Sequence, residues 1–228
     1  LLNSPLGTLP ILKKGAGYIR QVQIPLPKRM QVYNLLYRLG VDQVFTADFL
    51  AQIDQREPDE QQRQVWQEAV TPADTNRQLA FDWRYTLAEC DLPKVVVTAQ
   101  LANLDVGFPM LDQRLLDFSL RLPVEYKVKG FKLRWFFKEA LRGFLPDEIL
   151  TKKKQGFGLP IGVWTAKNHD LKALDEDSLL GLVERKIMRQ DFVDALFSRY
   201  LYEHPGYYGE MIWIAMMLEQ WFRGRPVR

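Results

Sequence analysis

The chain has 228 residues, of which 47% are hydrophobic and 12% aromatic, and it carries a formal net charge of +3. That composition predicts a globular protein of one or at most two domains and excludes a disordered chain. The most apolar window, Met211–Leu218, is far shorter than the ~18 residues that a membrane-spanning helix needs, so we expect no membrane partner.

Cysteine and histidine are scarce, which limits the chemistry that the chain can carry. Cys90 is the single cysteine, which excludes an internal disulfide and fits the reducing cytoplasm. His169 and His204 have no metal-ligand spacing, so we expect no metal site. Because the chain begins with Leu1 and shows no secretory leader, we expect it to be a fragment or a processed product.

The pattern along the chain is helical almost throughout. Residues 1–27 are rich in glycine and proline, which predicts an irregular lead-in or one helix broken by turns. After that, the spacing of apolar residues predicts an all-α fold of about eight to eleven helices. The predicted helices lie near residues 30–39, 46–53, 58–70, 71–92, 94–104, 112–120, 131–144, 175–186, 191–202 and 208–222.

Four residues mark where these helices should begin or break. Thr46 and Asp112 have side chains that accept a hydrogen bond from a first-turn N–H, so each predicts a helix start. Thr71 followed by proline predicts another. Pro93 lacks an N–H group and should kink or restart the chain. The helix over 208–222 is apolar nearly all round, which predicts that it is buried.

Positive charge is concentrated in one segment. Residues 121–154 contain ten Lys or Arg and four Asp or Glu, a local excess of six positive charges, so the rest of the chain is slightly negative. Such a concentration attracts anions. A basic run is more often simply a solvated helix face, and both readings stay open for the segment as a whole.

The basic segment ends in Lys-Lys-Lys-Gln-Gly-Phe-Gly at residues 152–158. Three adjacent ammonium groups repel one another unless water or an anion neutralises them. Gly156 and Gly158 let the backbone approach a ligand closely, and lysine is a compact point charge that suits a phosphate. The run therefore predicts a polyphosphate site, although a charge run before a loop is unspecific by itself.

Three motifs in order resemble one known family. They are Phe-Pro-Met-Leu-Asp at 108–112, Leu-Arg-Gly-Phe-Leu-Pro at 141–146 and Lys-Gln-Gly-Phe-Gly-Leu-Pro at 154–160. Together they resemble the C-terminal synthetase domain of the glutamine-hydrolysing asparagine synthetase family, and most closely its bacterial asparagine-synthetase-like amidotransferases. The resemblance covers residues 70–165 well and implies the helical C-terminal part of an adenine nucleotide alpha hydrolase-like (ATP-pyrophosphatase) synthetase domain.

The resemblance implies roles for the residues of the glycine-containing run. Lys154 matches the family's lysine that stabilises the charge developing as the acyl-adenylate forms and pyrophosphate leaves, which is a plausible electrostatic role. Lys152 stands where the family usually has arginine, and Gly156 follows in the same run, so both are expected to help bind ATP or pyrophosphate. The alternative for Lys154 is an ordinary surface lysine.

A second group of implied residues lies just before Pro109. Asp91 stands 18 positions before this proline, where a family acid helps the activation or amidation step. Lys94 falls where members often have a basic residue that binds ATP or pyrophosphate, and Glu89 is a weaker candidate beside the site. An acid and a base three positions apart on a helix also form a purely structural ion pair, so function and structure stay open here.

Two further acids are expected to be structural residues near the site. Asp112 matches the family acid that begins a helix and orders the adjoining loop, and we favour capping over catalysis. Asp105 stands where the family usually has the glutamate of a Glu-x-Arg motif, so an acid is retained. Gly107 stands at the position of the arginine. That departure leaves the acceptor substrate open.

The family's nucleotide loops and its N-terminal cysteine nucleophile do not occur in this sequence. The resemblance thus implies a C-terminal fragment of an enzyme that uses Mg-ATP to adenylate a carboxylate, aspartate or a related acceptor. Ammonia derived from glutamine then amidates it, and AMP and pyrophosphate leave. ATP, acceptor and ammonia would be brought by the missing half. We expect the isolated chain to be inactive, to bind no cofactor tightly and to expose apolar surface that favours self-association.

Two alternatives come from other functional classes. One is a helical module that binds nucleic acid or another polyanion through its basic face. The modest overall charge and the lack of a helix-turn-helix or zinc pattern count against nucleic acid. The other is a non-catalytic scaffold in which the synthetase features are relics.

Overall fold

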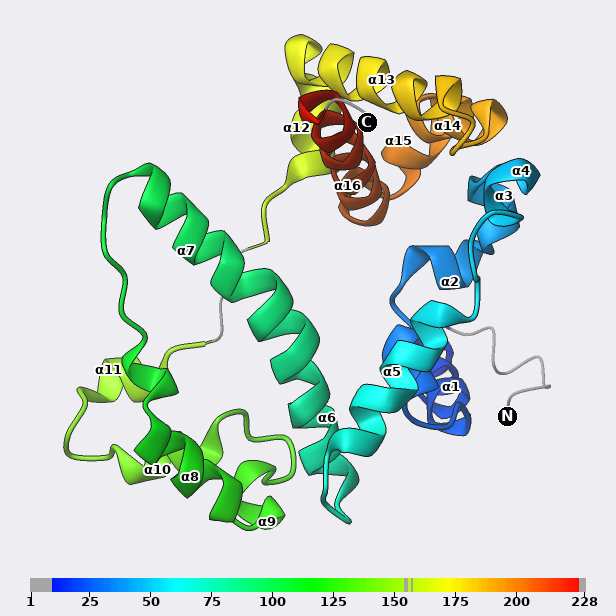
Figure 1. The fold of residues 1–228 in the computed structure, drawn as a ribbon. Helices are drawn as coiled ribbons and strands as arrows, with labels where there is room; N and C mark the ends of the chain where they lie inside the picture. Colours follow the sequence, from blue (N-terminus) through cyan, green and yellow to red (C-terminus); the bar gives the residue numbers. More distant parts are fainter. Residues whose placement is uncertain (1–9, 154–155, 157, 226–228) are drawn as a thin grey trace. The chain divides into compact units, whose positions relative to one another are not determined.

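The structure is a computed structural model that describes residues 10–153, 156 and 158–225, with side chains from residue 17 onward. Within these residues the regular structure is entirely helical, and extended residues pair only as isolated bridges (Figure 1). The all-α prediction is thus confirmed. No helix in the described ranges is both long and apolar enough to cross a membrane.

The chain forms two compact units, where the sequence predicted one helical domain or subdomain over residues 1–228. Unit 1 comprises Leu1–Asp59 and Phe157–Arg228, and unit 2 comprises Glu60–Gly156. The helices before residue 70 are α1 (Pro10–Gln23), η2 (Lys28–Gln31), α2 (Leu35–Leu39), α3 (Val41–Val44), α4 (Ala47–Leu50) and α5 (Glu57–Glu68). The remaining helices of unit 1 are α12 (Ile161–Lys167), α13 (His169–Glu184), α14 (Gln190–Ala195), η5 (Leu196–Tyr200), α15 (Leu201–Glu203) and α16 (Pro205–Gly224).

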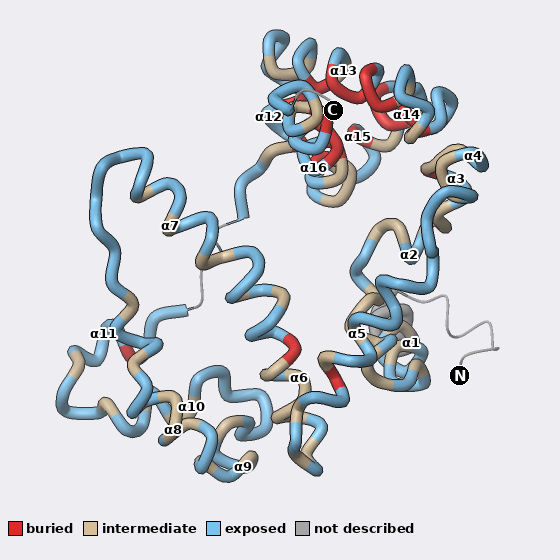
Figure 2. The backbone as a smooth tube through the Cα atoms, in the orientation of Figure 1, coloured by how far each residue is buried: buried red, intermediate tan, exposed pale blue. Residues whose placement is uncertain are grey.

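The main hydrophobic core lies in unit 1. Figure 2 shows the buried residues gathered along α13, α14 and the helices that follow. The core cluster consists of Val44, Leu179, Leu182, Met188, Phe192, Val193, Leu196, Phe197, Leu201, Ile212, Ala215 and Met216. Most of these positions recur at helical spacing on α13, α14 and α16, so each helix contributes one apolar face.

The segment before α2 corrects one expectation. Residues 1–27 were expected to be irregular, or one helix broken by turns, but Pro10–Gln23 forms an unbroken helix. The reason is where the prolines fall. Pro10 is the first helical residue, where its missing N–H costs nothing, and Pro25 and Pro27 come after the end. Glycines inside a helix weaken it without removing a hydrogen bond.

Two glycines let α12 and α16 pack with their backbones in contact. A Cβ atom built on Gly162 would overlap the carbonyl oxygen of Pro205, and one built on Gly209 would overlap the Cα of Gly162. Both glycines are buried. No residue with a side chain fits at either position without moving one helix away from the other.

A buried ion-pair network links α13 to α16. The side chain of Glu219 is 3% exposed and accepts hydrogen bonds from Arg185 Nε at 2.7 Å and Arg223 Nε at 3.0 Å. Burial by itself would raise the pKa of Glu219, but the two guanidinium groups outweigh it and hold the pKa below its usual value. Arg223 also pairs with the exposed carboxylate of Asp177.

A second buried carboxyl group lies where α12 meets α13. Asp175 is fully buried, and its Oδ2 accepts a hydrogen bond of 2.7 Å from the hydroxyl of Thr165, which is fully buried too. Oδ1 of Asp175 has no partner among the described residues. Burial therefore raises the pKa of Asp175, against the opposing effect of the Thr165 hydrogen bond.

Helix α16 is buried on one face only, which corrects the expectation from its apolar sequence. Ile212, Ala215 and Met216 belong to the core. The opposite face exposes large apolar side chains to solvent: Trp213, Ile214, Met217, Leu218 and Trp221. The apolar sequence of α16 therefore does not lead to burial on every side of the helix.

Unit 2 is built on one continuous helical run from residue 74 to residue 101. It starts as α6 (Asp74–Asp82), widens into the π-helical segment η3 (Trp83–Asp91) and returns to α-helix as α7 (Leu92–Leu101). Pro93 lies in the first turn of α7. The helix therefore continues past Pro93 instead of ending there. Proline has no N–H group to donate to the preceding turn, and the turns that precede it are the wider π-helical ones.

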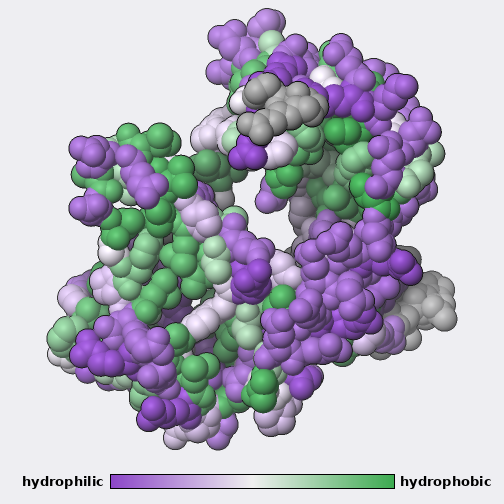
Figure 3. Space-filling model, in the orientation of Figure 1, coloured by the Kyte–Doolittle hydropathy of each residue, from purple (hydrophilic) through white to green (hydrophobic). Residues whose placement is uncertain are grey.

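The rest of unit 2 consists of short helices with few buried side chains. They are η4 (Pro109–Leu111), α8 (Gln113–Arg121), α9 (Val124–Lys127), α10 (Trp135–Ala140) and α11 (Asp147–Thr151). Only Trp66, Phe81 and Leu150 are buried hydrophobics among the described residues of this unit. Figure 3 shows hydrophobic surface along α7, where Val97 and Leu101 are more than half exposed.

The predicted helix over 131–144 is wrong in its extent, because only Trp135–Ala140 is helical. Arg134, which precedes the helix, adopts a left-handed conformation with φ of 54°, and Gly143 beyond its end has φ of 81°. Left-handed residues interrupt a right-handed helix. Apolar residues keep a helical spacing through the turns on both sides of α10, and for this reason the spacing predicted a longer helix.

Candidate functional site

Asp91 and Lys94 form an ion pair at the point where η3 passes into α7. Lys94 Nζ lies 2.8 Å from Asp91 Oδ1, and the two side chains are 63% and 50% exposed. The hydrogen bond to Asp91 raises the pKa of Lys94. The structure thus shows the structural pairing that the spacing allowed, and it leaves both groups accessible to a ligand.

Glu89 has a different partner. Its Oε1 lies 2.7 Å from Arg84 Nε, again between exposed side chains. The five-residue separation of this pair suits the π-helical segment that holds both residues, because π turns bring i and i+5 together. Glu89 and Asp91 therefore belong to two separate ion pairs.

Asp112 caps α8 as predicted. Its Oδ1 accepts a hydrogen bond of 2.9 Å from the backbone N–H of Arg114, and the Arg114 guanidinium binds both carboxylate oxygens. The side-chain hydrogen bond from Arg114, followed by the backbone one, holds the pKa of Asp112 below its usual value. A carboxylate engaged in this way orders the start of a helix.

Asp105 and Gly107 lie in the irregular segment between α7 and η4, and both are exposed. A Cβ atom on Gly107 would meet nothing within 4 Å. Space alone therefore does not require glycine at this position, where the resemblance implies an arginine.

The basic run begins where α11 ends. Lys152 is the C-terminal cap of α11, with its backbone N–H bonded to the carbonyl of Glu148 at 3.0 Å. Its side chain is exposed and forms no ion pair with the described residues, and the same holds for Lys153. Gly156 has open space around it. Lys154, the implied catalytic lysine, lies outside the described residues.

The structure brings these candidates together only in local pairs. The longest-range side-chain hydrogen bond described in unit 2 joins Lys127 Nζ on α9 to Asn76 Oδ1 on α6, at 2.9 Å. Asn76 also donates to the Thr71 hydroxyl, which accepts from the backbone N–H of Ala73 as well. The predicted helix start at Thr71 is wrong, because α6 begins at Asp74 with Ala73 as its N-cap. The sequence did not single out Asn76, and nothing in the sequence pairs it with Lys127.

The cavities do not coincide with the sequence-predicted residues. A shallow one of about 380 Å³ lies in unit 2 at the turn between α5 and α6. Its lining is Gln67, Ala69, Val70, Thr71, Pro72 and Arg77. None of the predicted site residues contributes to it.

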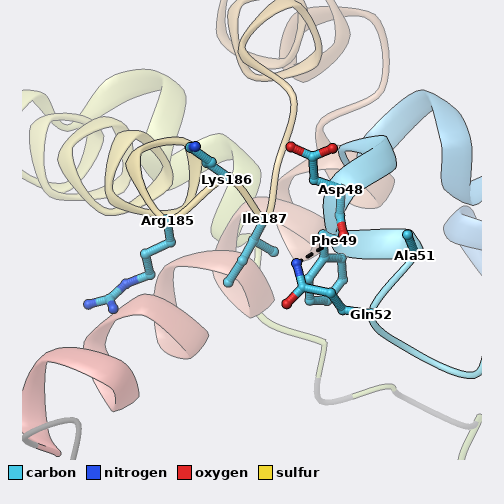
Figure 4. Close-up of a pocket in the computed structure, with 7 residues that line it drawn as sticks. All are labelled: Asp48, Phe49, Ala51, Gln52, Arg185, Lys186 and Ile187. Carbon is cyan, nitrogen blue, oxygen red and sulfur yellow. Dashed lines mark hydrogen bonds between the residues drawn. The ribbon is translucent and has the colours of Figure 1, made fainter.

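A larger groove of about 600 Å³ lies within unit 1, between α4 and the turn after α13 (Figure 4). Thr46 caps α4 by accepting from the backbone N–H of Phe49, as predicted, and its own backbone N–H donates to the carbonyl of Ile187 at 3.0 Å. The groove is lined by Asp48, Phe49, Ala51, Gln52, Arg185, Lys186 and Ile187. This groove could not be predicted from the sequence, because its two walls are more than 130 positions apart.

Two of the polar side chains that line this groove, Gln52 and Arg185, are engaged within unit 1. Gln52 Nε2 donates to the backbone carbonyl of Asp48 at 3.0 Å. In Figure 4 the Arg185 side chain extends away from Asp48, and it forms the buried pair with Glu219. None of the residues that line the groove is among the predicted site residues, so we assign no chemistry to it.

The basic run has some of the features that bind Mg-ATP. Exposed Lys152 and Lys153 and the open surroundings of Gly156 suit the charge and backbone approach of a pyrophosphate. Neither of the two cavities described above is lined by these residues. Within the described part of the chain, no group of three or more His, Cys, Asp or Glu residues is placed to hold a metal ion.

Comparisons with known proteins agree with the motif resemblance. A family model described as asparagine synthase matches residues 15–223. The chain is 32% identical over 62 residues to asparagine synthetase [glutamine-hydrolyzing] 1 of Bacillus subtilis (strain 168), which covers 27% of this chain and 10% of that protein. It is 36% identical over 56 residues to asparagine synthetase [glutamine-hydrolyzing] 3 of the same organism, covering 25% and 9%. No solved structure matches.

Proposed function

The chain belongs to the asparagine synthase family, and we propose that it is the C-terminal helical part of an ATP-dependent amidotransferase. The whole enzyme would adenylate a carboxylate, aspartate or a related acceptor, and amidate it with ammonia derived from glutamine. AMP and pyrophosphate would leave. The family match over residues 15–223 is the observation that carries this proposal.

The fragment character is part of the proposal. The stretches matched in the two curated relatives span 10% and 9% of their own lengths. The Ser-Gly-Gly-x-Asp-Ser loop that the family uses for ATP does not occur in the chain. ATP, acceptor and ammonia would therefore meet this chain through a nucleotide-binding half that it lacks, and the isolated chain would make no amide.

We propose that the basic run contacts the leaving pyrophosphate. Lys154 would supply positive charge as the acyl-adenylate forms, with Lys152 beside it and the backbone at Gly156 free to approach the phosphates. The exposure of Lys152 and its lack of an ion pair among the described residues support this role. Any Mg²⁺ would arrive with the nucleotide.

The role of Asp91 is proposed with its pairing in view. Bound to Lys94 at 2.8 Å, it would hold that ammonium group near the nucleotide, or it would release Lys94 to a phosphate and act on the acceptor itself. Exchanging the pair for a phosphate contact costs little, because an ion pair between exposed side chains contributes little to stability.

The test uses the full-length parent protein with aspartate, glutamine and Mg-ATP, with products separated by chromatography. Asparagine together with AMP and pyrophosphate supports the proposal. AMP and pyrophosphate without asparagine support the activation chemistry and show that the acceptor is another carboxylate. No AMP release with aspartate or other carboxylates, from a protein with intact glutaminase activity, contradicts the proposal and favours a polyanion-binding module or a scaffold.

The lysine assignment has its own test within that assay. We expect Lys154→Ala to lower the rate of pyrophosphate release by at least about 100-fold, the usual effect of removing a group that stabilises developing charge. Lys153→Ala is the matched control, because it removes one charge from the same run. Equal losses in both variants would show that only the general positive charge matters.

A further inference from the structure

Helix α16 has a second apolar face that its own unit does not use. Residues 212, 215, 216 and 219 point into unit 1 and are buried. The opposite face carries exposed Trp213, Ile214, Met217, Leu218 and Trp221, with exposures between 37% and 62%. We call these five residues the outer face of α16. Large apolar side chains gathered on one helix face are typical of an interaction site.

The spacing of the outer face is that of a helix-pairing seam. Glu210, Ile214, Met217 and Trp221 follow one another at intervals of four, three and four residues. This alternation keeps side chains in line along a helix and lets them interlock with a neighbouring helix. Trp213 and Leu218 flank the line on either side. The geometry suits another helix as the occupant, packed alongside α16.

The charges at the two ends of the seam indicate which helix that is. Glu210 near the start of α16 is exposed and forms no ion pair with the described residues. Near the other end, the guanidinium of Arg225 lies 4.5 Å from the ring centre of Trp221. An antiparallel copy of α16, centred between Ile214 and Met217, would bring its Glu210 beside this Trp221 and hence beside Arg225. The contact would occur twice.

We propose that the outer face of α16 is a self-association site, through which two copies of this chain pair with their α16 helices antiparallel. Ile214 of one copy then packs beside Met217 of the other, and Glu210 pairs with Arg225 at both ends. A parallel pair would set Glu210 against Glu210 near the axis, and like charges there disfavour it. Two-fold pairing through one self-complementary surface is the commonest route to a dimer.

The area of the outer face limits how strongly two copies can bind each other. Five side chains that each expose about half of ~150–250 Å² contribute on the order of 400 Å² per copy. A standard stable interface takes ~800 Å² per partner. We therefore expect a weak dimer with a dissociation constant on the order of 10 μM, which requires measurement across a concentration series.

The experiment is sedimentation equilibrium of the 228-residue chain from about 1 to 200 μM, well on both sides of the expected dissociation constant. Glu210→Arg and Arg225→Glu should each weaken the dimer roughly tenfold, because each sets like charges together at both ends. The double variant E210R/R225E restores opposite charges and should return the dissociation constant to within about threefold of the unchanged chain.

A substitution at the centre of the seam tests the apolar part. Ile214→Glu should abolish the dimer without lowering the melting temperature, because Ile214 is 62% exposed and lies outside the core. Leu180→Glu is the matched control, a change at a 43% exposed leucine of α13 that should leave the dimer intact.

Three results would overturn the proposal. The first is a chain that stays monomeric throughout the series. The second is a dimer that survives Ile214→Glu. The third is a double charge variant no stronger than the single ones, which would show that α16 does not meet a copy of itself.

Discussion

Glu219 shows what one buried charge contributes to this fold. Its carboxylate joins α13 to α16 through Arg185 and Arg223, and the two guanidinium groups keep its pKa low despite burial. We expect Glu219→Gln to lower the free energy of unfolding by about 3 kcal/mol at pH 7, as measured by urea denaturation, because it leaves two arginines without their shared partner.

The pH dependence of that loss has a definite sign. The pKa of Glu219 is lower in the folded chain than in the unfolded chain, where it is about 4.3. The stability that Glu219 contributes is therefore fully present above pH ~4.3, and it is lost as the pH falls through the pKa of the folded state. The difference between Glu219→Gln and the unchanged chain should shrink in acid. Asp177→Asn, which removes only the 64% exposed partner of Arg223, is the control and should lower stability much less than Glu219→Gln does.

Asp175 should behave in the opposite sense. Burial raises its pKa, so the folded state holds its proton more tightly than the unfolded chain does. Stability should therefore fall as pH rises from about 4 through the raised value. Asparagine keeps an acceptor for Thr165 but does not titrate. The stability of the unchanged chain relative to Asp175→Asn should improve between pH 7 and pH 4, and a flat difference would contradict this.

Single residues were also where the sequence was most informative. The capping roles of Thr46 and Asp112 followed from side-chain chemistry within three positions, and both are confirmed. The buried pairs of Glu219 and Asp175 could not be foreseen, because the partner of each carboxylate depends on how α13 meets its neighbours. The roles of Lys154 and Asp91 stay predictions.

Among the helices, the contact between α12 and α16 depends most on residue size. Gly162→Ala and Gly209→Ala should each lower the free energy of unfolding by about 2 kcal/mol or more, because the new methyl group overlaps backbone atoms that cannot move alone. Gly224→Ala, at the end of α16 with open space around it, is the control and should be neutral or slightly stabilising. Equal effects at all three positions would mean that helix propensity, not packing, decides.

Helix positions were easier to predict than helix lengths. Apolar spacing located most helices, but α10 is much shorter than the predicted 131–144, since left-handed residues at 134 and 143 cut it at both sides. The spacing reports which side chains face a core, and turns on the flanks of α10 keep the same spacing. A left-handed arginine has no signature of its own in the sequence.

At the scale of the whole molecule, the two units differ in how much they bury. Unit 1 holds the twelve-residue core cluster, whereas unit 2 buries Trp66, Phe81 and Leu150 among its described hydrophobic side chains. We expect unit 2 to open first under native conditions. Amide hydrogen exchange should be at least about tenfold faster at Phe81 and Leu150 than at Leu182 and Ile212. Comparable protection at all four would indicate a single cooperative unit.

The division into two units was not predicted, because composition and length fit one helical domain or two equally well. The family, by contrast, was found from three short motifs spread over 108–160, and the match to residues 15–223 confirms it. Motifs report a shared ancestry position by position. They do not report how much apolar surface each part of the chain buries.

The π-helical segment Trp83–Asp91 has a consequence for comparing this chain with its relatives. Wider turns fit extra residues into the same length of helix, so a segment of this kind can absorb an insertion or a deletion while the helices on both sides keep their facing. Asp91 is the last residue of the segment, so the count of positions back from Pro109 reaches it before crossing the segment. An insertion or deletion there would instead shift the numbering of Glu89 and of the residues before it. We expect relatives that differ by one residue here to keep α6 and α7 in place, and their gaps to fall inside this segment when sequences are aligned.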